Sequence, residues 1–230
     1  MSVISFLRLN KVYSLPKLQG LYSRGLSILA KARMRTITDK GTEIGLRAKL
    51  FKEVIPAGGI GVELGVYKGT LSKFILETNQ PSRLHLVDPW WKWRAEWHWA
   101  IGDKSTVRSF GALVIALEDE IASRRVEIHI KNSLEAIKAF EDEYLDWAYI
   151  DSTHSYETTK AEIMLLTRKI NPNGIIAGDD WREDPKHKHH GVYRAVKEFL
   201  TENPSYNLIF QEDAQWAISK VTDSAQSDNC

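Results

Sequence analysis

The order of apolar and polar residues along the chain indicates strands and helices in alternation. Short apolar runs are typical of strands buried on both faces of a parallel sheet. Between them, apolar residues recur every three or four positions, the spacing of a helix with one face on a core. Strands are predicted near 60–63, 83–87, 126–130, 145–150 and 174–178, followed by two more at 207–210 and 215–219.

Helices are predicted in the intervals between these strands. The longest is expected from Val107 to Ile121 as one continuous amphipathic helix. Another begins after Asn132, which can cap it together with Glu135 three residues later. A helix near 161–166 is expected to stop in the turn 171–174, which contains proline and glycine. The other helices are expected at 46–54, 71–75 and 192–199.

This alternation predicts the fold class and the domain organisation. We expect an α/β fold: a doubly wound, mostly parallel seven-stranded sheet with helices on both faces. The last two strands are joined by a short polar turn, so the final strand should run antiparallel. We expect a basic, helical N-terminal arm at 1–40, one domain at 41–220 and a flexible polar tail at 221–230.

Composition excludes several classes of protein. The chain has 230 residues, of which 43% are hydrophobic, enough for one domain with a sizeable core. The net charge is +1, so no overall field favours nucleic acid, and nucleic-acid partners are not expected. No apolar run is long enough to predict a transmembrane helix. Cys230 is the only cysteine, which fits a reducing compartment, and we expect a cytoplasmic protein.

Two segments have an unusual composition. Before Asp39 the arm has seven basic residues and no acidic residue, and its apolar residues recur at helical spacing. It could contact a membrane surface weakly, a second subunit of a homo-oligomer or the substrate entrance; it could also be a transit peptide or a helix packed on the domain. Five tryptophans lie between Trp90 and Trp99. They could wall a cofactor, bind an acceptor by stacking, or pack a lid on the core.

Acidic residues follow four of the predicted parallel strands directly. They are Glu63, Asp88, Asp151, and the adjacent pair Asp179 and Asp180. Ligands of open α/β sheets bind outside the carboxyl ends of the strands. Carboxylates placed at random would be scattered over loops and helix faces, so this placement predicts a functional site.

The turn after the first strand predicts one half of that site. Glu63, Gly65 and Gly69 surround a strand-to-helix turn that includes Tyr67, where glycines let a backbone approach a ligand and the helix start presents free N–H groups. Asp88 is placed to accept hydrogen bonds from ribose hydroxyls, or is a turn residue before Pro89. Ser133 would lie near an adenine edge, or is a plain helix cap.

The later strand ends predict the other half. Asp151, Asp179 and Asp180 would bring three carboxylates together, which requires a cation or raises a pKa. Oxygen ligands suit Mg²⁺, Mn²⁺ or Ca²⁺. In the alternative, Asp180 caps a turn and Asp179 faces solvent. His154 could be a general base or a structural residue. His187, His189 and His190 are expected in a solvated basic loop.

The residues from about 45 to 220 resemble a known family. Residues 63–69 (ELGVYKG) resemble motif I of class I S-adenosylmethionine-dependent methyltransferases. Residues 149–156 (YIDSTHSY) and 174–181 (GIIAGDDW) resemble motifs of the methyltransferase 24 group, which includes macrocin-type sugar O-methyltransferases. A related enzyme is described as a cephalosporin hydroxylase. Residues 63–69 are also similar to the glycine motif of catechol-type O-methyltransferases.

The resemblance implies the cofactors and the chemistry. It implies S-adenosyl-L-methionine near Gly65, at a position where any side chain would collide with the methionine part, and Mg²⁺ (or Mn²⁺) on Asp151, Asp179 and Asp180. The chain departs from catechol-type enzymes, which have a lysine at the position of His154 and a hydroxyl at that of Leu71. Ile175 also replaces the second glycine of the usual pair.

The expected function is Mg²⁺-dependent O-methyl transfer to a small hydroxylated molecule: a sugar, a natural product or a phenol. The metal would lower the pKa of an acceptor oxygen, and Asp151 or His154 would take the proton. Two alternatives stay open. One is a metal-dependent hydroxylase on the same fold, and the other is a non-catalytic module that retains the cofactor pocket.

Overall fold

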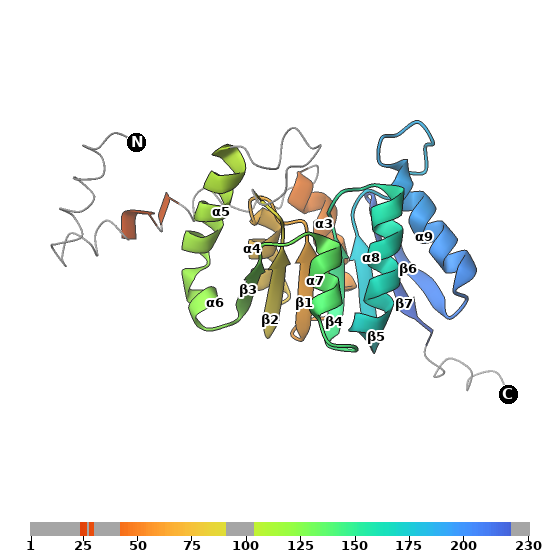
Figure 1. Ribbon diagram of the computed structural model, residues 1–230, viewed down its shortest axis with the longest axis horizontal. Coiled ribbons are helices and arrows are strands. Elements are labelled where there is room, and N and C mark those ends of the chain that lie inside the picture. Colours follow the sequence, from red (N-terminus) through yellow and green to blue (C-terminus); the bar gives the residue numbers. More distant parts are fainter. Residues whose placement is uncertain (1–23, 27, 30–41, 91–103, 222–230) are drawn as a thin grey trace.

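The computed structural model describes residues 24–26, 28–29, 42–90 and 104–221 (Figure 1). Within these ranges one sheet of seven strands has the order β3-β2-β1-β4-β5-β7-β6. The strands β1 to β5 pair in parallel, and β7 runs antiparallel to both β5 and β6. This confirms the predicted fold class. The strands are β1 (Ile60–Leu64), β2 (Arg83–Val87), β3 (Val126–His129), β4 (Leu145–Ile150), β5 (Ile170–Gly178), β6 (Tyr206–Glu212) and β7 (Gln215–Lys220).

Helices cover both faces of this sheet (Figure 1). Apolar side chains of α3, α4 and α5 share one core cluster with alternate residues of the strands, and those of α7, α8 and α9 share the other. The helices are α3 (Glu43–Glu53), α4 (Thr70–Thr78), α5 (Lys104–Ala116), α6 (Glu118–Ala122), α7 (Ser133–Ala139), α8 (Tyr156–Lys169) and α9 (His190–Glu202).

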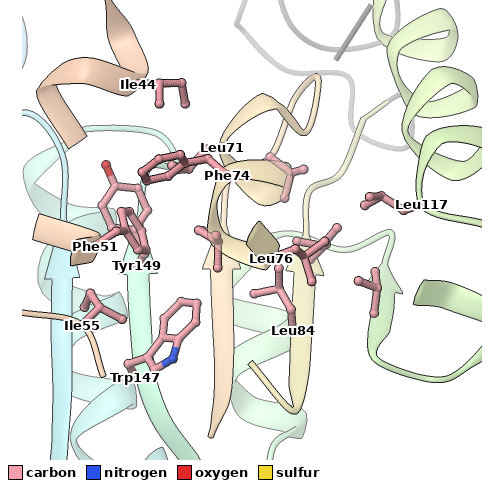
Figure 2. Close-up of a cluster of buried hydrophobic side chains, with 14 of the residues drawn as sticks. Ile44, Phe51, Ile55, Leu71, Phe74, Leu76, Leu84, Leu117, Trp147 and Tyr149 are labelled. Carbon is pink, nitrogen blue, oxygen red and sulfur yellow. The ribbon is translucent and has the colours of Figure 1, made fainter. Parts of the chain in front are cut away.

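Aromatic rings fill the core between α3 and the middle of the sheet (Figure 2). Phe51 of α3 packs edge-on against Phe74 of α4 and Trp147 of β4, with ring centroids 6.4 and 6.2 Å apart. Tyr149 lies two residues after Trp147 and therefore on the same face of the sheet, 5.1 Å from Phe51. This packing holds the last turn of α3 against β4.

Two predicted boundaries were wrong. The single helix expected from Val107 to Ile121 is two helices, because Leu117 (φ −109°, ψ 23°) leaves the helical region between α5 and α6. Leu117 is nevertheless buried, so the apolar spacing continues across the break. Strand β5 begins at Ile170, four residues earlier than expected, and includes Pro172 at an irregularity in its pairing with β4.

The strand order places β1 beside both β2 and β4, so the chain changes direction across the sheet at β1. Such a switch point opens a crevice at the carboxyl ends of the strands.

Three predicted segments lie mostly or wholly outside the described residues: the arm, the tail after residue 221 and the tryptophans from Trp91 to Trp99. Residues 24–26 and 28–29 of the arm are described and are helical. Across the described ranges, no helix combines the length and apolar character needed to cross a membrane.

Candidate active site

The turn after β1 has a backbone that favours glycine. Gly65 has a φ of 94°, in the left-handed region. A Cβ atom built on Gly65 would lie 1.9 Å from the carbonyl oxygen of Asp151. A side chain at Gly65 would therefore collide with the protein's own backbone, where the ends of β1 and β4 meet. The expected collision with a bound ligand is not needed to explain this glycine.

Helix α4 begins immediately after this turn. Gly69 is its N-cap residue and has a φ of 74°. Thr70 lines the cavity at the strand ends, whereas Gly69 is not among the described lining residues. The hydroxyl of Ser72 donates to the carboxyl group of Glu63 and is fully buried. Of the two hydroxyls near Leu71, that of Thr70 is therefore the one available to a ligand.

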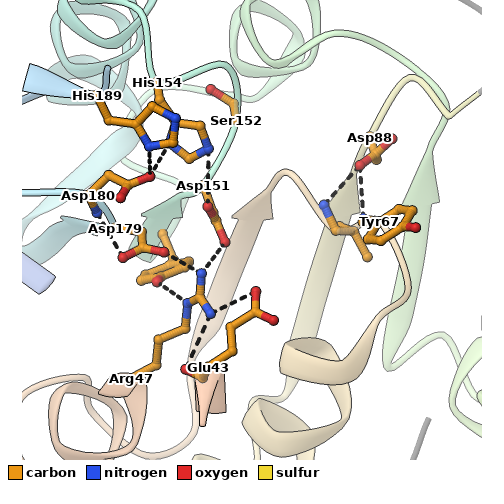
Figure 3. A network of polar contacts seen from close by, with 12 residues as sticks. Glu43, Arg47, Tyr67, Asp88, Asp151, Ser152, His154, Asp179, Asp180 and His189 are labelled. Carbon is orange, nitrogen blue, oxygen red and sulfur yellow. Dashed lines mark hydrogen bonds and ion pairs between the residues drawn. The ribbon is translucent and has the colours of Figure 1, made fainter. Parts of the chain in front are cut away.

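Asp88 at the end of β2 fixes the turn. Its Oδ2 accepts hydrogen bonds from the backbone N–H groups of Val66 at 3.0 Å and Tyr67 at 2.9 Å (Figure 3). Its Oδ1 accepts from the N–H of Trp90 at 2.7 Å. Burial raises the pKa of Asp88 against the lowering effect of these bonds. Asp88 lines the cavity, and its predicted contact with a ribose stays a prediction.

Trp90 is the described member of the tryptophan segment, and it packs in the core. Its side chain is fully buried, and its ring lies 4.9 Å from that of Phe110. Its Nε1–H donates to the carbonyl oxygen of Tyr67 at 3.0 Å. Trp90 therefore supports the turn at Tyr67 from behind.

Glu63 at the end of β1 is buried, and burial raises its pKa to about 8, against the lowering effect of the Ser72 hydroxyl. Glu63 is therefore protonated at neutral pH and brings no full negative charge to the cavity that it lines. Its proton and the Ser72 hydroxyl satisfy a carboxyl group that would be costly to bury as an anion.

Helix α7 starts at the cavity as the sequence predicts. The side chain of Asn132 accepts the N–H of Glu135 at 2.8 Å, which confirms the predicted cap. Ser133, the first residue of α7, is buried and lines the same cavity as Asp88. Its predicted place near an adenine edge stays a prediction.

An arginine lies between two of the predicted metal ligands. The guanidinium of Arg47 on α3 donates to Asp151 Oδ2 at 2.8 Å and forms a very short ion pair with Asp179 Oδ2 (Figure 3). Its Nε–H donates to the hydroxyl of Tyr149 at 2.8 Å. Burial lowers the pKa of Arg47, but Tyr149, Asp151 and Asp179 outweigh it and raise the pKa above its usual value. One fixed positive charge therefore serves two carboxylates.

Asp179 has further protein partners. Its Oδ1 accepts hydrogen bonds from the N–H of Asp180 at 2.8 Å and from the amide of Gln215 at 2.5 Å. Together with the ion pair to Arg47, these bonds occupy both carboxylate oxygens. Asp179 is thus half-buried, and its carboxylate is bound within the protein. The alternative expectation, in which Asp179 faces solvent, does not describe this arrangement.

Asp180 is turned away from this network and toward two histidines. Its Oδ2 lies 3.1 Å from His154 Nδ1 and 2.5 Å from His189 Nδ1, and the two imidazole rings stack at 4.5 Å (Figure 3). Burial raises the pKa of Asp180, but His154 and His189 outweigh it and lower the pKa below its usual value. His154 and Asp180 both have left-handed φ angles, 58° and 62°. Such strain is common where side-chain direction serves function.

The pKa values of Asp151 and His154 are both shifted from their ordinary values. Burial raises the pKa of Asp151 to about 7; Arg47 lowers it, and Asp179 raises it further. Burial also lowers the pKa of His154, against the raising effect of Asp180, so that imidazole is neutral at pH 7. His154 Nε2 lies 3.6 Å from Asp151 Oδ1. A proton-accepting group is therefore present at neutral pH.

A single cavity of about 530 Å³ joins the two halves of the site. One side is formed by the turn after β1 and by Asp88 and Ser133, and the other by Arg47 and the residues around Asp151. The volume is in the range of small-molecule sites. The structure therefore brings all but one of the predicted site residues to one cavity; the exception is Gly69. The lining includes Glu63, Gly65, Tyr67, Asp88, Ser133, Asp151, His154, Asp179 and Asp180.

Glu162 on α8 supports the loop that carries Asp151. The hydroxyl of Ser152 donates to Glu162 Oε1 at 2.6 Å, and Glu162 is fully buried. Burial raises its pKa to about 7, against the lowering effect of the hydroxyls of Ser133 and Ser152. Glu162 therefore holds its proton in the folded state under conditions where it would lose it in the unfolded state.

This shift predicts a pH dependence of stability. Between pH 4.5, the ordinary pKa, and pH 7, the folded protein keeps the Glu162 proton and the unfolded protein does not, so its contribution to the free energy of unfolding falls as the pH rises. The loss is about 3 kcal/mol at most. We expect Glu162→Gln to flatten the pH dependence in urea titrations. Glu157→Gln, an exposed position on the same helix, is the matched control. If stability in Glu162→Gln changes with pH as steeply as in the wild type, the prediction is wrong.

Two residues of the site were not predicted. Arg47 lies between Ile44 and Leu50 on the buried face of α3, and a charged residue in an apolar stripe is a signal that could have revealed it. His189 was expected in a solvated loop, but it lines the cavity and contacts Asp180. Nothing local in the sequence distinguishes His189 from His187 and His190.

Comparison with known protein families finds a match for this chain. A family described as methyltransferase domain matches residues 62–181, slightly more than half of the chain, from β1 to just past β5. No curated protein sequence matches the chain significantly. The family match covers the turn after β1 and all four strand ends that carry the acidic residues.

Solved structures with the same fold are distant in sequence. A candidate O-methyltransferase from Klebsiella pneumoniae is 16% identical, with a TM-score of 0.56 over 85% of this chain and 88% of that one. A candidate rRNA methylase from Clostridium thermocellum is 14% identical, with a TM-score of 0.53 over 81% and 100%. An rRNA methylase from Streptococcus thermophilus is 13% identical, with a TM-score of 0.51 over 79% and 98%. At these identities the comparison shows a shared fold.

Proposed function

The chain belongs to the methyltransferase domain family and is an S-adenosylmethionine-dependent methyltransferase, and we propose that it methylates an oxygen of a small hydroxylated molecule. The observation that carries this proposal is the shared cavity. The turn after β1 and Asp88 form its donor side, and Asp151 with Arg47 forms its acceptor side. Both sides lie at neighbouring strand ends, so a methyl donor and an acceptor would meet in one enclosed space.

The residues of the donor side fit S-adenosylmethionine, which supplies an activated methyl group when bound. Backbone N–H groups and Asp88 shape the turn, Thr70 offers a hydroxyl to the same space, and Ser133 lines it. Glu63 is neutral there, so the donor side has one ionisable carboxylate, that of Asp88. We propose that Asp88 accepts hydrogen bonds from the ribose hydroxyls, in the role that acidic residues have at this strand end of nucleotide-binding folds.

Asp151 is the base in this proposal. Its Oδ2 accepts a hydrogen bond from Arg47, which orients the carboxylate, and its Oδ1 lies 3.6 Å from His154 Nε2. A base with a pKa near 7 is matched to proton transfer at neutral pH. Asp151 removes the hydroxyl proton as the oxygen attacks the methyl carbon, and S-adenosylhomocysteine leaves. Arg47 keeps the two carboxylates in place during this transfer.

Asp151, Asp179 and Asp180, the acidic trio, are not arranged to bind a metal ion together. A cation bound to Asp151 and Asp179 together would lie against the guanidinium of Arg47, which already satisfies both carboxylates. Asp180 with His154 and His189 offers a better set, because these ligand atoms lie within 4.8 Å of one another. We propose that a divalent ion binds there, where it would supply Lewis-acid activation of the acceptor. Asp180 keeps its predicted role, and His154 becomes a ligand.

Divalent ions separate the two ligand sets. We expect Mn²⁺, which accepts both oxygen and nitrogen ligands, to raise the melting temperature, since an ion that binds only the folded state stabilises it. The rise should be lost in Asp180→Asn and His189→Gln and kept in Asp179→Asn. The reverse pattern for His189 and Asp179 would assign the ion to the acidic trio. A melting temperature that does not respond to millimolar Mn²⁺ would remove the metal from the proposal.

A small acceptor is favoured over RNA by the charges around the cavity. The acceptor side carries the carboxylates of Asp151, Asp179 and Asp180, with Glu43 at its edge, and these outnumber its arginines, Arg47 and the Arg182 that pairs with Asp180. Lys68 adds one positive charge to the lining on the donor side. Proteins that bind nucleic acid neutralise phosphates with lysine and arginine. This cavity would instead repel a phosphate backbone.

A metal-dependent hydroxylase is the second candidate. The set His154, His189 and Asp180 is two histidines and one carboxylate, the ligand set of non-haem Fe(II) oxygenases. Hydroxylation would need O₂ and a two-electron reductant in addition to the substrate.

The two candidates are separated by product mass. A screen of sugars, phenols and an rRNA transcript with S-adenosylmethionine should give a small product heavier by one CH₂ group, with S-adenosylhomocysteine formed in equal amount. A product heavier by one oxygen atom, formed with Fe(II), O₂ and a reductant, would favour the hydroxylase. Methylation of the transcript alone would overturn the small-molecule assignment.

A further inference from the structure

A second histidine group lies on the sheet away from the cavity. His85 on β2 and both Glu127 and His129 on β3 have ligand atoms that all lie within 4.8 Å of one another. None of the three lines the cavity. They gather at the sheet edge formed by β3 (Figure 1), where Phe140, the residue that follows α7, packs against both histidines.

The strand register explains why these side chains meet. His85 pairs with Glu127, and Val87 pairs with His129, in the parallel ladder between β2 and β3. Residues two apart on a strand share a face, so Glu127 and His129 both stand beside His85. Leu84 and Leu86 point to the opposite face and belong to the core under α4 and α5. The three polar side chains therefore form a compact triangle on one face.

The dimensions of the triangle suit a tetrahedral metal. His85 Nδ1 lies 2.9 Å from His129 Nε2 and 3.8 Å from Glu127 Oε2, and His129 Nε2 lies 3.9 Å from Glu127 Oε1. Ligand atoms about 2.0–2.2 Å from a tetrahedral zinc ion are about 3.3–3.5 Å apart. The observed separations bracket this value, so shifts of about half an ångström would bring all three ligands into place.

The chemistry of the group also suits a cation. Burial lowers the pKa of His85 to about 4, with further lowering by His129 and Arg83, and burial lowers the pKa of His129. Both imidazoles are neutral at pH 7, so Glu127 forms no ion pair with them and is too distant for a hydrogen bond. Neutral imidazole and carboxylate are the forms that bind metals.

A supporting residue is already in position behind His85. Its second ring nitrogen, Nε2, lies 3.1 Å from the hydroxyl of Tyr144. Histidine ligands of metals commonly donate their other ring N–H to such a partner, which fixes the tautomer and the ring orientation. Phe140 packs against both imidazole rings, 4.9 Å from His85 and 5.7 Å from His129. The side chain of Glu127 is 53% exposed and leaves the group open to ions from solvent.

We propose that His85, Glu127 and His129 form a zinc site with a fourth position open to water, which fastens β3 to β2 at the edge of the sheet. This site is independent of the methyltransferase proposal and of the group around Asp180. Without the ion, the two histidines form the N···N hydrogen bond seen here. Zinc would replace that single bond with bonds to three side chains.

The test uses the untagged full chain with His189→Gln, which removes one histidine from the cavity group. We expect calorimetry to show one Zn²⁺ bound, and Co²⁺ to give the intense visible absorption of tetrahedral coordination. Adding Glu127→Gln or His129→Gln should weaken Zn²⁺ binding by about 100-fold or more, since loss of an outer-shell partner alone costs 10–100-fold. Asp142→Asn, an exposed acidic position outside the group, should bind as the parent does.

Glu127→Gln is the decisive variant, because its exposed side chain is not needed for folding. Its melting temperature without zinc should equal that of the parent, while the rise caused by zinc disappears. Unchanged Zn²⁺ affinity in Glu127→Gln and His129→Gln would overturn the proposal and leave a hydrogen-bonded pair of histidines. The proposal would also be overturned if the His189→Gln chain bound no Zn²⁺.

Discussion

Replacement of Asp151 by asparagine is expected to lower methyl-transfer turnover by about 10²–10⁴-fold, the range for loss of a general base. Asparagine keeps the shape and can still contact Arg47, but it cannot accept the acceptor's proton. Affinity for S-adenosylhomocysteine should stay close to the wild-type value, because the donor side is untouched. Steady-state rates and calorimetric titration measure the two quantities separately.

The pH profile of the wild type adds an independent test of the same base. Only ionised Asp151 accepts a proton, so activity should rise with pH through an apparent pKa near 7 and level off above it. Asp142→Asn makes the same chemical change at an exposed position and should retain wild-type turnover. If Asp151→Asn keeps wild-type turnover, Asp151 is not the base.

Replacement of Arg47 by methionine is expected to destabilise the fold by about 3–5 kcal/mol, the cost of removing one partner from a buried charge network. Asp151 and Asp179 would be left side by side without a counter-charge, and the hydroxyl of Tyr149 would lose a donor. Arg47→Lys keeps the charge but not the forked geometry, so it should recover part of the stability. Urea titrations provide the free energies of unfolding.

Arg168→Met is the matched control for this prediction. Arg168 pairs with Asp142 at the surface, where the loss of an ion pair costs about 0–1 kcal/mol. The instability of Arg47→Met should also grow with pH, because the two uncompensated carboxylates ionise as the pH rises. An Arg47→Met protein as stable as Arg168→Met would show that the guanidinium is not needed to hold the carboxylates together.

The sheet could be predicted because its signal is local. Buried parallel strands are continuous apolar runs, and residues such as Asp88 and Asp151 follow them directly in sequence. Boundaries were harder to predict where packing overrides the pattern. Leu117 fits the apolar spacing of one helix, yet its backbone breaks that helix, since burial of the side chain does not depend on helical backbone angles.

The sequence predicted where the site lies, but not which of its polar side chains contact one another. Strand ends placed Asp151 and Asp179 together, but which cation lies between them depends on α3, more than a hundred residues earlier in the chain. The contact of His189 with Asp180 depends on the path of a loop with no regular pattern. Periodicity reports which face of an element is buried, and not which polar side chains meet there.

The close approach of Gly65 to the backbone of Asp151 fixes the distance between the donor side and the acceptor side of the cavity. With no room for even one added carbon atom, the donor turn and the acceptor strand end cannot move closer together, and the pairing of β1 with β4 opposes their moving apart. A synthetic molecule that joins an adenosine to an acceptor mimic would therefore bind well at one linker length only. We expect the affinity measured in solution for a series of linker lengths to have a single sharp maximum, and the length at that maximum gives the distance between the two sides.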